Sequence, residues 1–369
     1  MNRYELADTD SLCTPALVFY ADLIRKNLDL MLQIAGSADR LWPHVKTHKC
    51  EALVRMQLEK GITHFKCATI AEAEMAARAG AQAVALAYPL VGPNIKRFTS
   101  LMQAFPSTTF YAVGDDLHQL KQLGQAGCET GQTISLLVDV DMGTHRTGVM
   151  PGALYDFYRA CEKIPGLRPC GLHCYDGNHG ICDPELRRRA VEQTDESVFA
   201  VVHRLRAAGS GCGLLIMGGT PTFPCHARYA DVCLSPGTCV LSDYGYATTY
   251  PDEAFLPAAA VLTRVISHGI QGRFTLDLGY KGLAADPPGA RGLLLGVDGA
   301  HPLVQNEEHW VWQMDPSLED RRPAIGQVLT VLPTHICPTV ALYPRALLVR
   351  DHHITGQWEI TARNRRLRF

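Results

Sequence analysis

The possible folds of this chain are limited most strongly by a repeated alternation of short apolar runs with longer helical patterns. An apolar run followed by an amphipathic stretch is typical of a βα unit, in which a buried parallel strand precedes a helix. The sequence contains eight such units, with helices expected for example at 71–79 and 184–207. Because eight parallel strands close a barrel, the pattern predicts an α/β fold with a (β/α)8 barrel of the TIM type. The predicted strands are 41–46, 64–69, 83–88, 109–114, 134–141, 170–175, 214–219 and 231–240.

The sequence pattern changes near residue 250. Beyond this point, helix-length patterns give way to frequent Gly and Pro and to alternating segments such as 328–332 and 358–361. This alternation is typical of half-buried strands and predicts an all-β C-terminal domain. We place the barrel at 15–250 and the β-domain at 251–369, and we assign residues 1–14 to the β-domain, to which they could add a strand.

Composition and charge exclude several classes of function. The chain has 369 residues, is 47% apolar and carries a formal net charge of -2, so it has no electrostatic bias toward nucleic acid or anionic membranes. Its first residues lack the basic start and apolar core of a secretion signal, and no apolar run is long enough to span a membrane. The 13 cysteines are scattered and never spaced as Cys-x-x-Cys, which argues against a disulfide framework and a zinc knuckle. We expect a cytoplasmic enzyme with neither a nucleic-acid nor a membrane partner.

Residues with chemical potential lie at the carboxyl ends of the predicted strands, where the active sites of such barrels are found. Lys46 ends the first strand, and the segments 218–220 (Gly-Gly-Thr) and 237–238 (Gly-Thr) lie at the ends of the last two. Glycine N–H groups can approach an anion closely and threonine hydroxyls add donors, so these segments predict a phosphate site. The structural alternatives are ordinary turns for the two segments and a solvent-exposed side chain for Lys46.

The lysine and the phosphate site together predict a cofactor. A lysine that reacts with an aldehyde must lie where burial and fixed neighbours tune its amine. A lysine on the first strand opposite a phosphate site on the last two is what a pyridoxal phosphate enzyme requires, because the aldehyde is held covalently while the phosphate anchors the other end. The sequence therefore predicts pyridoxal phosphate with Lys46 as its covalent anchor.

Six motifs follow one another along the chain. They are Pro-His-Val-Lys-Thr-His-Lys at 43–49, Asp-Val-Asp-Met-Gly-Thr-His-Arg-Thr-Gly at 139–148, Gly-Leu-His-Cys-Tyr-Asp-Gly at 171–177, Gly-Gly-Thr at 218–220, Ser-Pro-Gly-Thr at 235–238 and Asp-Leu-Gly-Tyr-Lys at 277–281. In this order they resemble the D-threonine aldolase and D-serine dehydratase family of fold-type III pyridoxal phosphate enzymes, whose barrel is related to that of alanine racemase. The resemblance covers nearly the whole chain, and the first motif is quite specific to the family.

The resemblance implies roles for residues of the barrel. It makes Lys46 the residue that forms the Schiff base, places Arg146 near the phenolic oxygen of the cofactor, and places Tyr175 on the ring or substrate side. The structural alternatives are an ion pair at the barrel rim for Arg146 and a buried tyrosine for Tyr175. Related barrels work as dimers, so we expect a homodimer. The residues implied to hold the phosphate are Gly218, Gly219, Thr220, Gly237 and Thr238.

The β-domain carries a further motif, His335-Ile-Cys337. Residues two apart in a strand point to the same face, so the imidazole and the thiol can converge on one ion. This pair suits Zn²⁺ better than Mg²⁺ or Ca²⁺, with water or substrate in the remaining positions. The resemblance implies a divalent metal beside the cofactor, and a cysteine here, typical of the dehydratases where the aldolases have a carboxylate, indicates zinc. The alternative is a buried cysteine next to a hydrogen-bonded histidine.

These parts predict a metal-assisted lyase that acts on a D-3-hydroxy amino acid. If Lys46 removes the Cα proton and the metal draws off the 3-hydroxyl, the reaction is a dehydration like that of D-serine dehydratase. If the metal-bound hydroxyl loses its proton to a base, the Cα–Cβ bond breaks to glycine and an aldehyde, as in D-threonine aldolase. Both reactions use the same residues, so the sequence leaves this choice open.

Two other classes of function remain. An amino-acid racemase of the alanine racemase type would need a second base, for which Tyr280 or Tyr343 is available. A non-catalytic pyridoxal phosphate carrier would have no use for the β-domain.

The chain also departs from the family at several positions. Trp42 and Ser235 stand where we expect arginine, and the segment 281–286 lacks an expected serine. The roles of Trp42, Asp176 and His309 stay open at this stage.

Overall fold

The structure, a computed structural model, describes residues 3–7 and 9–369. These residues group into two compact units, which we describe separately. Residues 31–46, 50–237 and 364–369 make up the barrel unit. The described residues up to Leu30, together with 47–49 and 238–363, make up the β-rich unit. None of the described helices is both long and apolar enough to cross a membrane.

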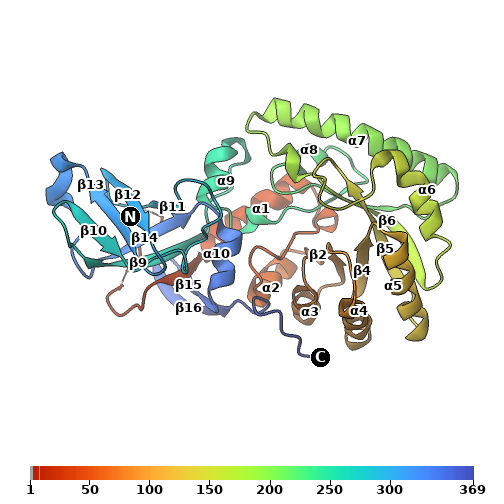
Figure 1. Ribbon diagram of the computed structural model, residues 1–369, viewed down its shortest axis with the longest axis horizontal. Helices are drawn as coiled ribbons and strands as arrows, with labels where there is room; N and C mark the ends of the chain where they lie inside the picture. Colours follow the sequence, from red (N-terminus) through yellow and green to blue (C-terminus); the bar gives the residue numbers. More distant parts are fainter. Residues whose placement is uncertain (1–2, 8) are drawn as a thin grey trace. The chain divides into compact units, whose positions relative to one another are not determined.

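The barrel unit is built on a parallel sheet whose strands lie in chain order (Figure 1). Each strand pairs with the next along the chain, as every βα unit of the sequence pattern requires. Within the described residues the sheet has seven regular strands. They are β2 (His64–Cys67), β3 (Ala83–Leu86), β4 (Thr109–Gly114), β5 (Ile134–Asp141), β6 (Leu167–Tyr175), β7 (Leu214–Met217) and β8 (Cys233–Leu234).

An extended segment, residues 41–45, takes the place of the first predicted strand. The N–H of Trp42 donates to a carbonyl of β8 and the N–H of Val45 to a carbonyl of β2, both at 2.8 Å. The segment therefore joins the two edges of the sheet, but it forms only isolated bridges. Pro43 lies between these contacts and has no N–H, which interrupts a regular ladder. The predicted fold class, an α/β barrel followed by a mostly β domain, is confirmed, although its first strand is less regular than expected.

Helices follow the strands and lie along the outside of the sheet (Figure 1). Thr69 caps α3 by accepting the N–H of Glu72 at 3.2 Å, and Gly80, with φ of 109°, ends it. Asp183 caps α7, whose first residue is proline. The helices of the barrel unit are α2 (Glu51–Glu59), α3 (Ile70–Ala79), α4 (Pro93–Ala104), α5 (Leu117–Glu129), α6 (Pro151–Cys161), α7 (Pro184–Ala207) and α8 (Phe223–His226), with short 3₁₀ turns η1 (Ala38–Arg40) and η2 (Gly177–His179). A further helix, α1 (Ala21–Ala35), precedes them in the chain, and its residues up to Leu30 group with the β-rich unit.

Trp42, whose role the sequence leaves open, fills the interior of the barrel. It is 3% exposed, and its ring stacks on His64 with centroids 4.9 Å apart and meets Tyr111 edge-on at 5.6 Å. Small side chains on β3 make room for this large ring. Trp42 therefore fills an apolar core position, where a polar side chain would need hydrogen-bond partners. The cluster around it contains Ala83, Ala85, Val113, Leu137 and Ile216.

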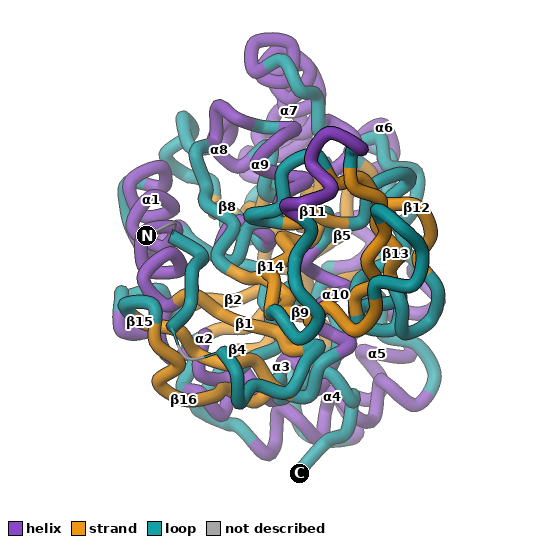
Figure 2. The backbone as a smooth tube through the Cα atoms, turned by 90° about the vertical axis from the view of Figure 1, so that its left-hand side faces the viewer, coloured by secondary structure: helices purple, strands orange, loops and turns teal. Residues whose placement is uncertain are grey.

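The β-rich unit contains one sheet of nine strands among the described residues. Its main path runs β12-β13-β10-β9-β1-β15-β16, and β14 joins β9 to β11. Figure 2 shows β15 and β16 side by side. The strands are β1 (Ala16–Tyr20), β9 (Ala259–Ser267), β10 (Arg273–Leu276), β11 (Gly292–Leu294), β12 (Ala300–Gln305), β13 (Trp310–Met314), β14 (Val328–Pro333), β15 (Arg345–Arg350) and β16 (His353–Glu359). The helices of this unit are η3 (Thr238–Val240), α9 (Tyr244–Thr249), η4 (Pro251–Glu253), η5 (Pro316–Arg321) and α10 (Ile336–Leu342).

The N-terminal part of the chain enters the β-rich sheet through β1, which follows the segment 1–14 instead of lying within it. β1 pairs antiparallel with β9 and parallel with β15. Residues 238–250 also group with the β-rich unit. The domain bounds of 15–250 and 251–369 stay a prediction. The pairing of β1 with β9 and β15 joins segments far apart in the chain, and a local sequence pattern does not record it.

Gly171 of β6 offers a test of how closely the parallel strands pack. A Cβ atom there would lie against the carbonyl oxygen of Leu214 in β7, so the strands would have to separate. We expect Gly171→Ala to lower the free energy of unfolding by about 3 kcal/mol, the upper part of the usual range for overpacking, in urea denaturation. Gly213→Ala is the control, because a Cβ atom at Gly213 meets nothing within 4 Å. Equal stability of the two variants would contradict this packing.

Candidate active site

A cavity of about 320 Å³ lies within the barrel unit. This volume is at the lower end of the range for small-molecule pockets, about 300–1,000 Å³. Lys46 directly follows the closing segment 41–45, Tyr175 ends β6, and Arg146 comes from the loop after β5. Side chains that the sequence analysis singled out in three separate segments therefore meet in one cavity. Its lining includes His44, Lys46, Lys66, Arg146, His173 and Tyr175.

Positive groups gather around the ring of Tyr175. The Nζ atoms of Lys46 and Lys66 lie 5.7 and 5.6 Å from the ring centroid, and the guanidinium carbon of Arg146 lies 5.1 Å from it. An aromatic face attracts cations within about 6 Å. Several positive groups around one ring also make the cavity attractive to an anion. In addition, the N–H of Lys46 donates to Nδ1 of His44 at 3.3 Å, which helps to fix its main chain.

Lys66 is the residue of this cavity that sequence reasoning missed. It lies in β2 and is 2% exposed, and its Nζ lies 2.6 Å from Oγ of Ser235. Burial and, after it, the charge of Lys46 lower the pKa of Lys66 to about 7. The available signal was a charged residue inside a four-residue buried strand, because lysine is almost never fully buried unless it is paired.

The glycines predicted to hold a phosphate have partners for their N–H groups. The N–H of Gly218 donates to a carbonyl of β6 at 3.0 Å. The N–H of Gly219 donates to Oγ1 of Thr222 at 2.9 Å, and that of Gly237 to Oγ1 of Thr220 at 3.1 Å. Sequence reasoning assigned these N–H groups to an anion, whereas the structure uses them to shape the loops.

The same glycines are needed for space. Gly218 has a φ of 84°, which favours glycine, and a Cβ atom there would lie 2.9 Å from Cδ2 of His226. A Cβ atom at Gly219 would lie 3.0 Å from Cε2 of Tyr175. The loop after β7 is thus packed closely against His226 and Tyr175, which leaves room only for glycine at these two positions. The assignment of the phosphate to residues 218–220 and 237–238 stays a prediction.

A buried charged cluster holds the loop after β7 in place. His226 of α8 lies between two carboxylates, with Nε2 2.9 Å from Oδ2 of Asp176 and Nδ1 3.1 Å from Oδ2 of Asp195. The second contact is close but not aligned as a hydrogen bond. Asp176 also accepts the hydroxyl hydrogen of Thr222 at 2.6 Å, and Thr222 in turn accepts the N–H of Gly219. Asp176, whose role the sequence leaves open, therefore fixes this loop.

The members of the cluster tune one another's charges. Burial lowers the pKa of His226, but the carboxylates of Asp176 and Asp195 more than offset this and raise it to about 9. Burial raises the pKa of Asp176, yet its hydrogen bonds from His226 and Thr222 bring it below the ordinary value. For Asp195 burial prevails, and its pKa is raised. His226 is therefore an imidazolium at neutral pH.

The metal pair predicted from the sequence lies in the β-rich unit, but not in a strand. β14 ends at Pro333, His335 is the N-cap of α10, and Cys337 lies in the first turn of that helix. The prediction that the two residues share one face of a strand is therefore wrong. Pro338 follows within the first helical turn, where N–H groups have no partner inside the helix, so this segment suits a helix start.

The side chains of His335 and Cys337 nevertheless approach each other. A hydrogen bond with Cys337 is the largest of the causes, ahead of Asp286, that raise the pKa of His335 to about 9. Nδ1 of His335 lies 2.5 Å from Oδ2 of Asp286. A carboxylate that accepts Nδ1–H leaves Nε2 to bind a metal, which is how histidine ligands are commonly oriented. The sequence did not pair Asp286 with His335, because the two residues lie 49 positions apart in the chain.

The donor set of this pair fits zinc. The hydroxyls of Thr47 and Thr238 lie 3.2 and 3.5 Å from Sγ of Cys337. Among the described residues, no group of three His, Cys, Asp or Glu side chains is placed to hold a metal. A metal bound here would take an imidazole and a thiolate from the chain, a pair that zinc prefers, and complete its coordination with water or substrate.

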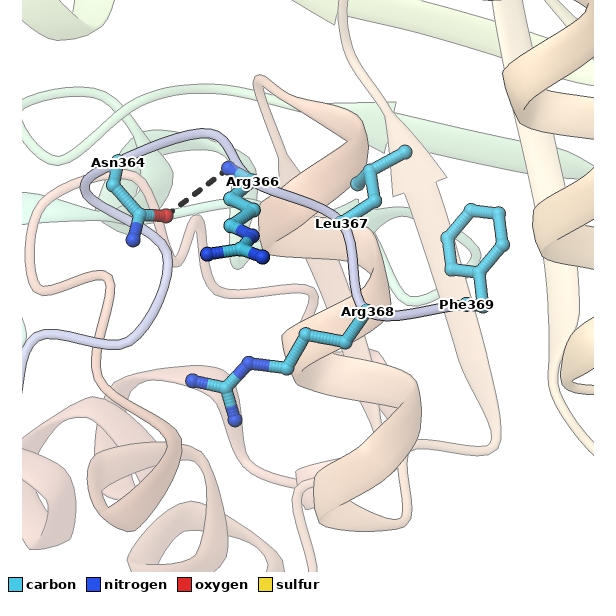
Figure 3. A pocket seen from close by; sticks show the side chains of 5 residues that line it. All are labelled: Asn364, Arg366, Leu367, Arg368 and Phe369. Carbon is cyan, nitrogen blue, oxygen red and sulfur yellow. Dashed lines mark hydrogen bonds between the residues drawn. The ribbon is translucent and has the colours of Figure 1, made fainter.

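A second hollow, of about 560 Å³, lies at the end of the chain (Figure 3). It is lined by residues of the tail 364–369, and the N–H of Arg366 donates to the side-chain oxygen of Asn364. The tail is held by the N–H of Arg368, which lies 3.1 Å from both carboxylate oxygens of Glu74. The lining of this hollow contains none of the residues predicted to carry chemistry. We therefore assign the chemistry to the cavity around Lys46.

The two candidate bases of a racemase, Tyr343 and Tyr280, and His309, whose role the sequence leaves open, have contacts within the β-rich unit. The hydroxyl of Tyr343 is buried and donates to the carbonyl of Gly282 at 2.7 Å. Tyr280 is 39% exposed, and its ring centroid lies 6.0 Å from the guanidinium carbon of Arg291. His309 lies in the turn between β12 and β13, which its carbonyl closes by accepting a main-chain N–H. Each of the three residues therefore has a structural contact within the β-rich unit.

The cluster around His226 predicts a pH dependence of stability. Because folding raises the pKa of His226 from 6.5 to about 9, protonation of His226 stabilises the fold. This contribution is complete below pH 6.5 and is lost as the pH rises through about 9. We expect His226→Gln to lower the free energy of unfolding by about 3–5 kcal/mol at pH 6.5, because it leaves Asp176 and Asp195 unpaired, and by clearly less at pH 9. Urea denaturation at the two pH values measures this, with the exposed His203→Gln as control. An equal loss of stability in His226→Gln at both pH values would contradict this prediction.

Comparisons with known proteins cover both units. The family models described as alanine racemase, N-terminal domain, and as putative serine dehydratase domain match residues 21–244 and 258–349. The chain is 30% identical over 358 residues to D-threonine aldolase from Arthrobacter sp., which covers 95% of this chain and 92% of that protein. It is 24% identical over 382 residues to D-threo-3-hydroxyaspartate dehydratase from Delftia sp. (strain HT23), with 95% and 97% covered. The solved structure of D-threonine aldolase from Filomicrobium marinum matches with a TM-score of 0.88 at 27% identity, with 97% and 98% covered.

These matches extend over more than half of the chain for one family model and over nearly the whole length of both proteins for the first relative. They confirm the resemblance drawn from the six motifs, the barrel fold and the class of enzyme. The chain therefore belongs to the D-threonine aldolase and serine dehydratase family of fold-type III pyridoxal phosphate enzymes, lyases that act on D-3-hydroxy amino acids.

Proposed function

We propose that this protein is a metal-assisted lyase of D-3-hydroxy amino acids in which Lys46 carries pyridoxal phosphate. The observation that carries this proposal is the cavity in which Lys46 and Arg146 lie around the ring of Tyr175. An amine that faces a small-molecule cavity beside other cations is placed to bind an aldehyde that brings negative charge. The Gly-Gly-Thr segment at 218–220, which the family resemblance assigns to the phosphate, supports the other end of the ligand.

Each residue of the cavity has a proposed part. Lys46 binds the cofactor covalently and takes or returns a proton at Cα of the substrate. Arg146 is assigned to the negative ring oxygen, and Tyr175 to the ring. When bound, the cofactor supplies an electron sink for the bond broken at Cα. The residues proposed for the phosphate are Gly218, Gly219, Thr220, Gly237 and Thr238.

His335 and Cys337 are the proposed ligands of a divalent metal, and their donor types favour zinc. Asp286 holds Nδ1 of the imidazole and so directs Nε2 to the metal. Thr47, whose hydroxyl lies 3.2 Å from Sγ of Cys337, is the residue that follows Lys46 in the chain. The metal would supply Lewis-acid chemistry at the 3-hydroxyl of the substrate.

Of the two reactions open to such a site, we place retro-aldol cleavage first. The relative at 30% identity is a D-threonine aldolase, so D-threonine is the first substrate to test. Dehydration is the second candidate. Cys337 favours it, because the resemblance puts a cysteine there in the dehydratases, and a relative at 24% identity is a D-threo-3-hydroxyaspartate dehydratase.

A racemase is less well supported by the residues available. The phenol of Tyr343 already donates to the carbonyl of Gly282, and burial raises its pKa, so it is a poor base. A carrier without catalysis would have no use for the β-rich unit, in which His335 and Cys337 lie.

The expected assembly is a cytoplasmic homodimer without a nucleic-acid or membrane partner. The net charge of -2 supports the absence of a nucleic-acid partner, and the dimer follows from the resemblance to alanine racemase-like barrels. Sedimentation equilibrium measures the mass in solution. A mass of twice the 40.5 kDa of one chain would support the dimer, and the mass of one chain would refute it.

Lys46→Ala tests the covalent anchor. We expect the variant, mixed with pyridoxal phosphate, to lack the visible absorbance of a lysine-bound cofactor and to lose activity by about 10³-fold, because both the anchor and the proton carrier are gone. Absorbance spectra and borohydride trapping followed by peptide mapping measure this. The exposed Lys163→Ala is the matched control. Trapped cofactor in the Lys46→Ala protein would rule out the assignment.

Metal removal and product analysis test the second half of the site. We expect a chelator to abolish turnover of D-threonine and D-threo-3-hydroxyaspartate, and Asp286→Asn to weaken metal affinity about 10–100-fold because His335 loses its orienting carboxylate. The exposed Asp298→Asn is the control. Glycine with an aldehyde would indicate cleavage, and ammonia with a keto acid would indicate dehydration. Full activity after complete metal removal would refute the metal-assisted mechanism.

A further inference from the structure

Lys66 is a buried lysine that the proposed chemistry does not use. Its side chain is 2% exposed and lines the cavity that contains Lys46. Buried lysines usually have a carboxylate partner, because an unpaired buried charge is costly. In the part of the chain that the structure describes, no carboxylate lies within ion-pair distance of this nitrogen. Its charge therefore lacks the partner that a structural lysine has.

The contacts of Lys66 fix its orientation through neutral groups. Nζ lies 2.6 Å from Oγ of Ser235 and 3.5 Å from Nε2 of His173. Asp139 lies 2.7 Å from Nδ1 of His173, so Nδ1 carries the proton and Nε2 accepts from Lys66. The hydroxyl of Ser235 in turn donates a hydrogen bond to the carbonyl of Gly218 at 2.8 Å. An ammonium has three N–H groups, and these contacts engage two of them.

The electrostatic surroundings of Lys66 lack an anion at close range. Its nitrogen lies 5.6 Å from the ring of Tyr175, around which Lys46 and Arg146 also lie. Like charges repel more strongly in a cavity of low dielectric constant than in water. The charges of Lys46 and Arg146 oppose a charge on Lys66, whereas those of Asp139 and Asp176 favour it. The other titratable groups of the cavity wall are His44, Tyr88, His173 and Tyr175.

We propose that Lys66 is a cofactor-binding residue that takes up a proton when a negative group of the cofactor enters the cavity. The inference rests on the proposed function, because it requires pyridoxal phosphate at Lys46. The cofactor brings a phosphate and a negative ring oxygen, and either group would favour the ammonium form of Lys66. The proton comes from solvent, and no covalent bond to Lys66 forms. The lowered pKa of about 7 means that the empty cavity holds this charge in only part of the molecules at neutral pH.

Calorimetric titration of the cofactor-free, full-length protein with 4-deoxypyridoxine phosphate tests the proposal. This analogue has both negative groups but no aldehyde, so no link to Lys46 forms and no proton from that reaction enters the count. One pH unit above the pKa of about 7, we expect wild type to take up close to one proton more per site than Lys66→Met. Titrations in buffers of different ionisation enthalpy give the proton count. At neutral pH the variant should bind the analogue about tenfold more weakly, as expected for one charge-assisted hydrogen bond.

Further variants separate charge from hydrogen bonding. Lys66→Gln keeps a polar group beside Ser235 without the charge, so it should lose the proton uptake as Lys66→Met does. Lys163→Met, at an exposed lysine, should match wild type. Equal proton uptake in wild type and both Lys66 variants would overturn the proposal, and so would wild-type affinity in Lys66→Gln. Titration with 4-deoxypyridoxine, which lacks the phosphate, then identifies the group: a remaining difference assigns Lys66 to the ring oxygen, and no difference assigns it to the phosphate.

The test distinguishes this inference from the proposed function. If Lys46→Ala keeps the trapped cofactor, the proposed function fails. If Lys46 carries the cofactor but the proton counts agree, only the role of Lys66 fails. Should the Lys66 variants not fold, wild type alone still decides, because its affinity for the analogue should fall by up to about tenfold per pH unit above the pKa of Lys66. An affinity that does not change with pH in this range would refute the proton uptake.

Discussion

Closure of the parallel sheet by the segment 41–45 is the interaction on which the rest of the barrel unit depends. Its main chain bonds to β8 on one side and to β2 on the other. Lys46 follows this segment directly, so its position is set by backbone hydrogen bonds instead of by contacts of its own flexible side chain. The same closure brings β2, with Lys66, next to the chain that carries Lys46, and the cationic cavity results from it.

The barrel unit separates these charged side chains into two groups with different neighbours. Lys46, Lys66 and Arg146 surround an aromatic ring and face a cavity. His226, by contrast, lies between Asp176 and Asp195, away from solvent. The first group lacks anions and is suited to receive them, whereas the second is balanced internally and holds a loop. A buried charge can thus serve binding or support, and its partners decide which.

Much of the fold and part of the site could be predicted from the sequence, because both depend on local patterns. The βα alternation predicted the barrel, a strand end pointed to Lys46, and the family resemblance pointed to Arg146 and Tyr175. The strand assigned to His335 and Cys337 failed because a proline tolerated in a first helical turn also fits a strand end. Asp286 and Lys66 were missed for another reason. Their roles come from partners far away in the sequence, and residue patterns do not record such pairings.

The place of β1 in its sheet has a consequence for the order of folding. β1 lies between β9 and β15, so its partners are synthesised after the whole barrel sequence has left the ribosome. Domains generally fold as they emerge, and the barrel strands pair with their sequence neighbours. The apolar strand Ala-Leu-Val-Phe-Tyr therefore has no sheet partner until more than two hundred further residues have been synthesised. During this delay the nascent chain carries an apolar strand with unpaired edges, which is the kind of segment that can pair wrongly with other chains.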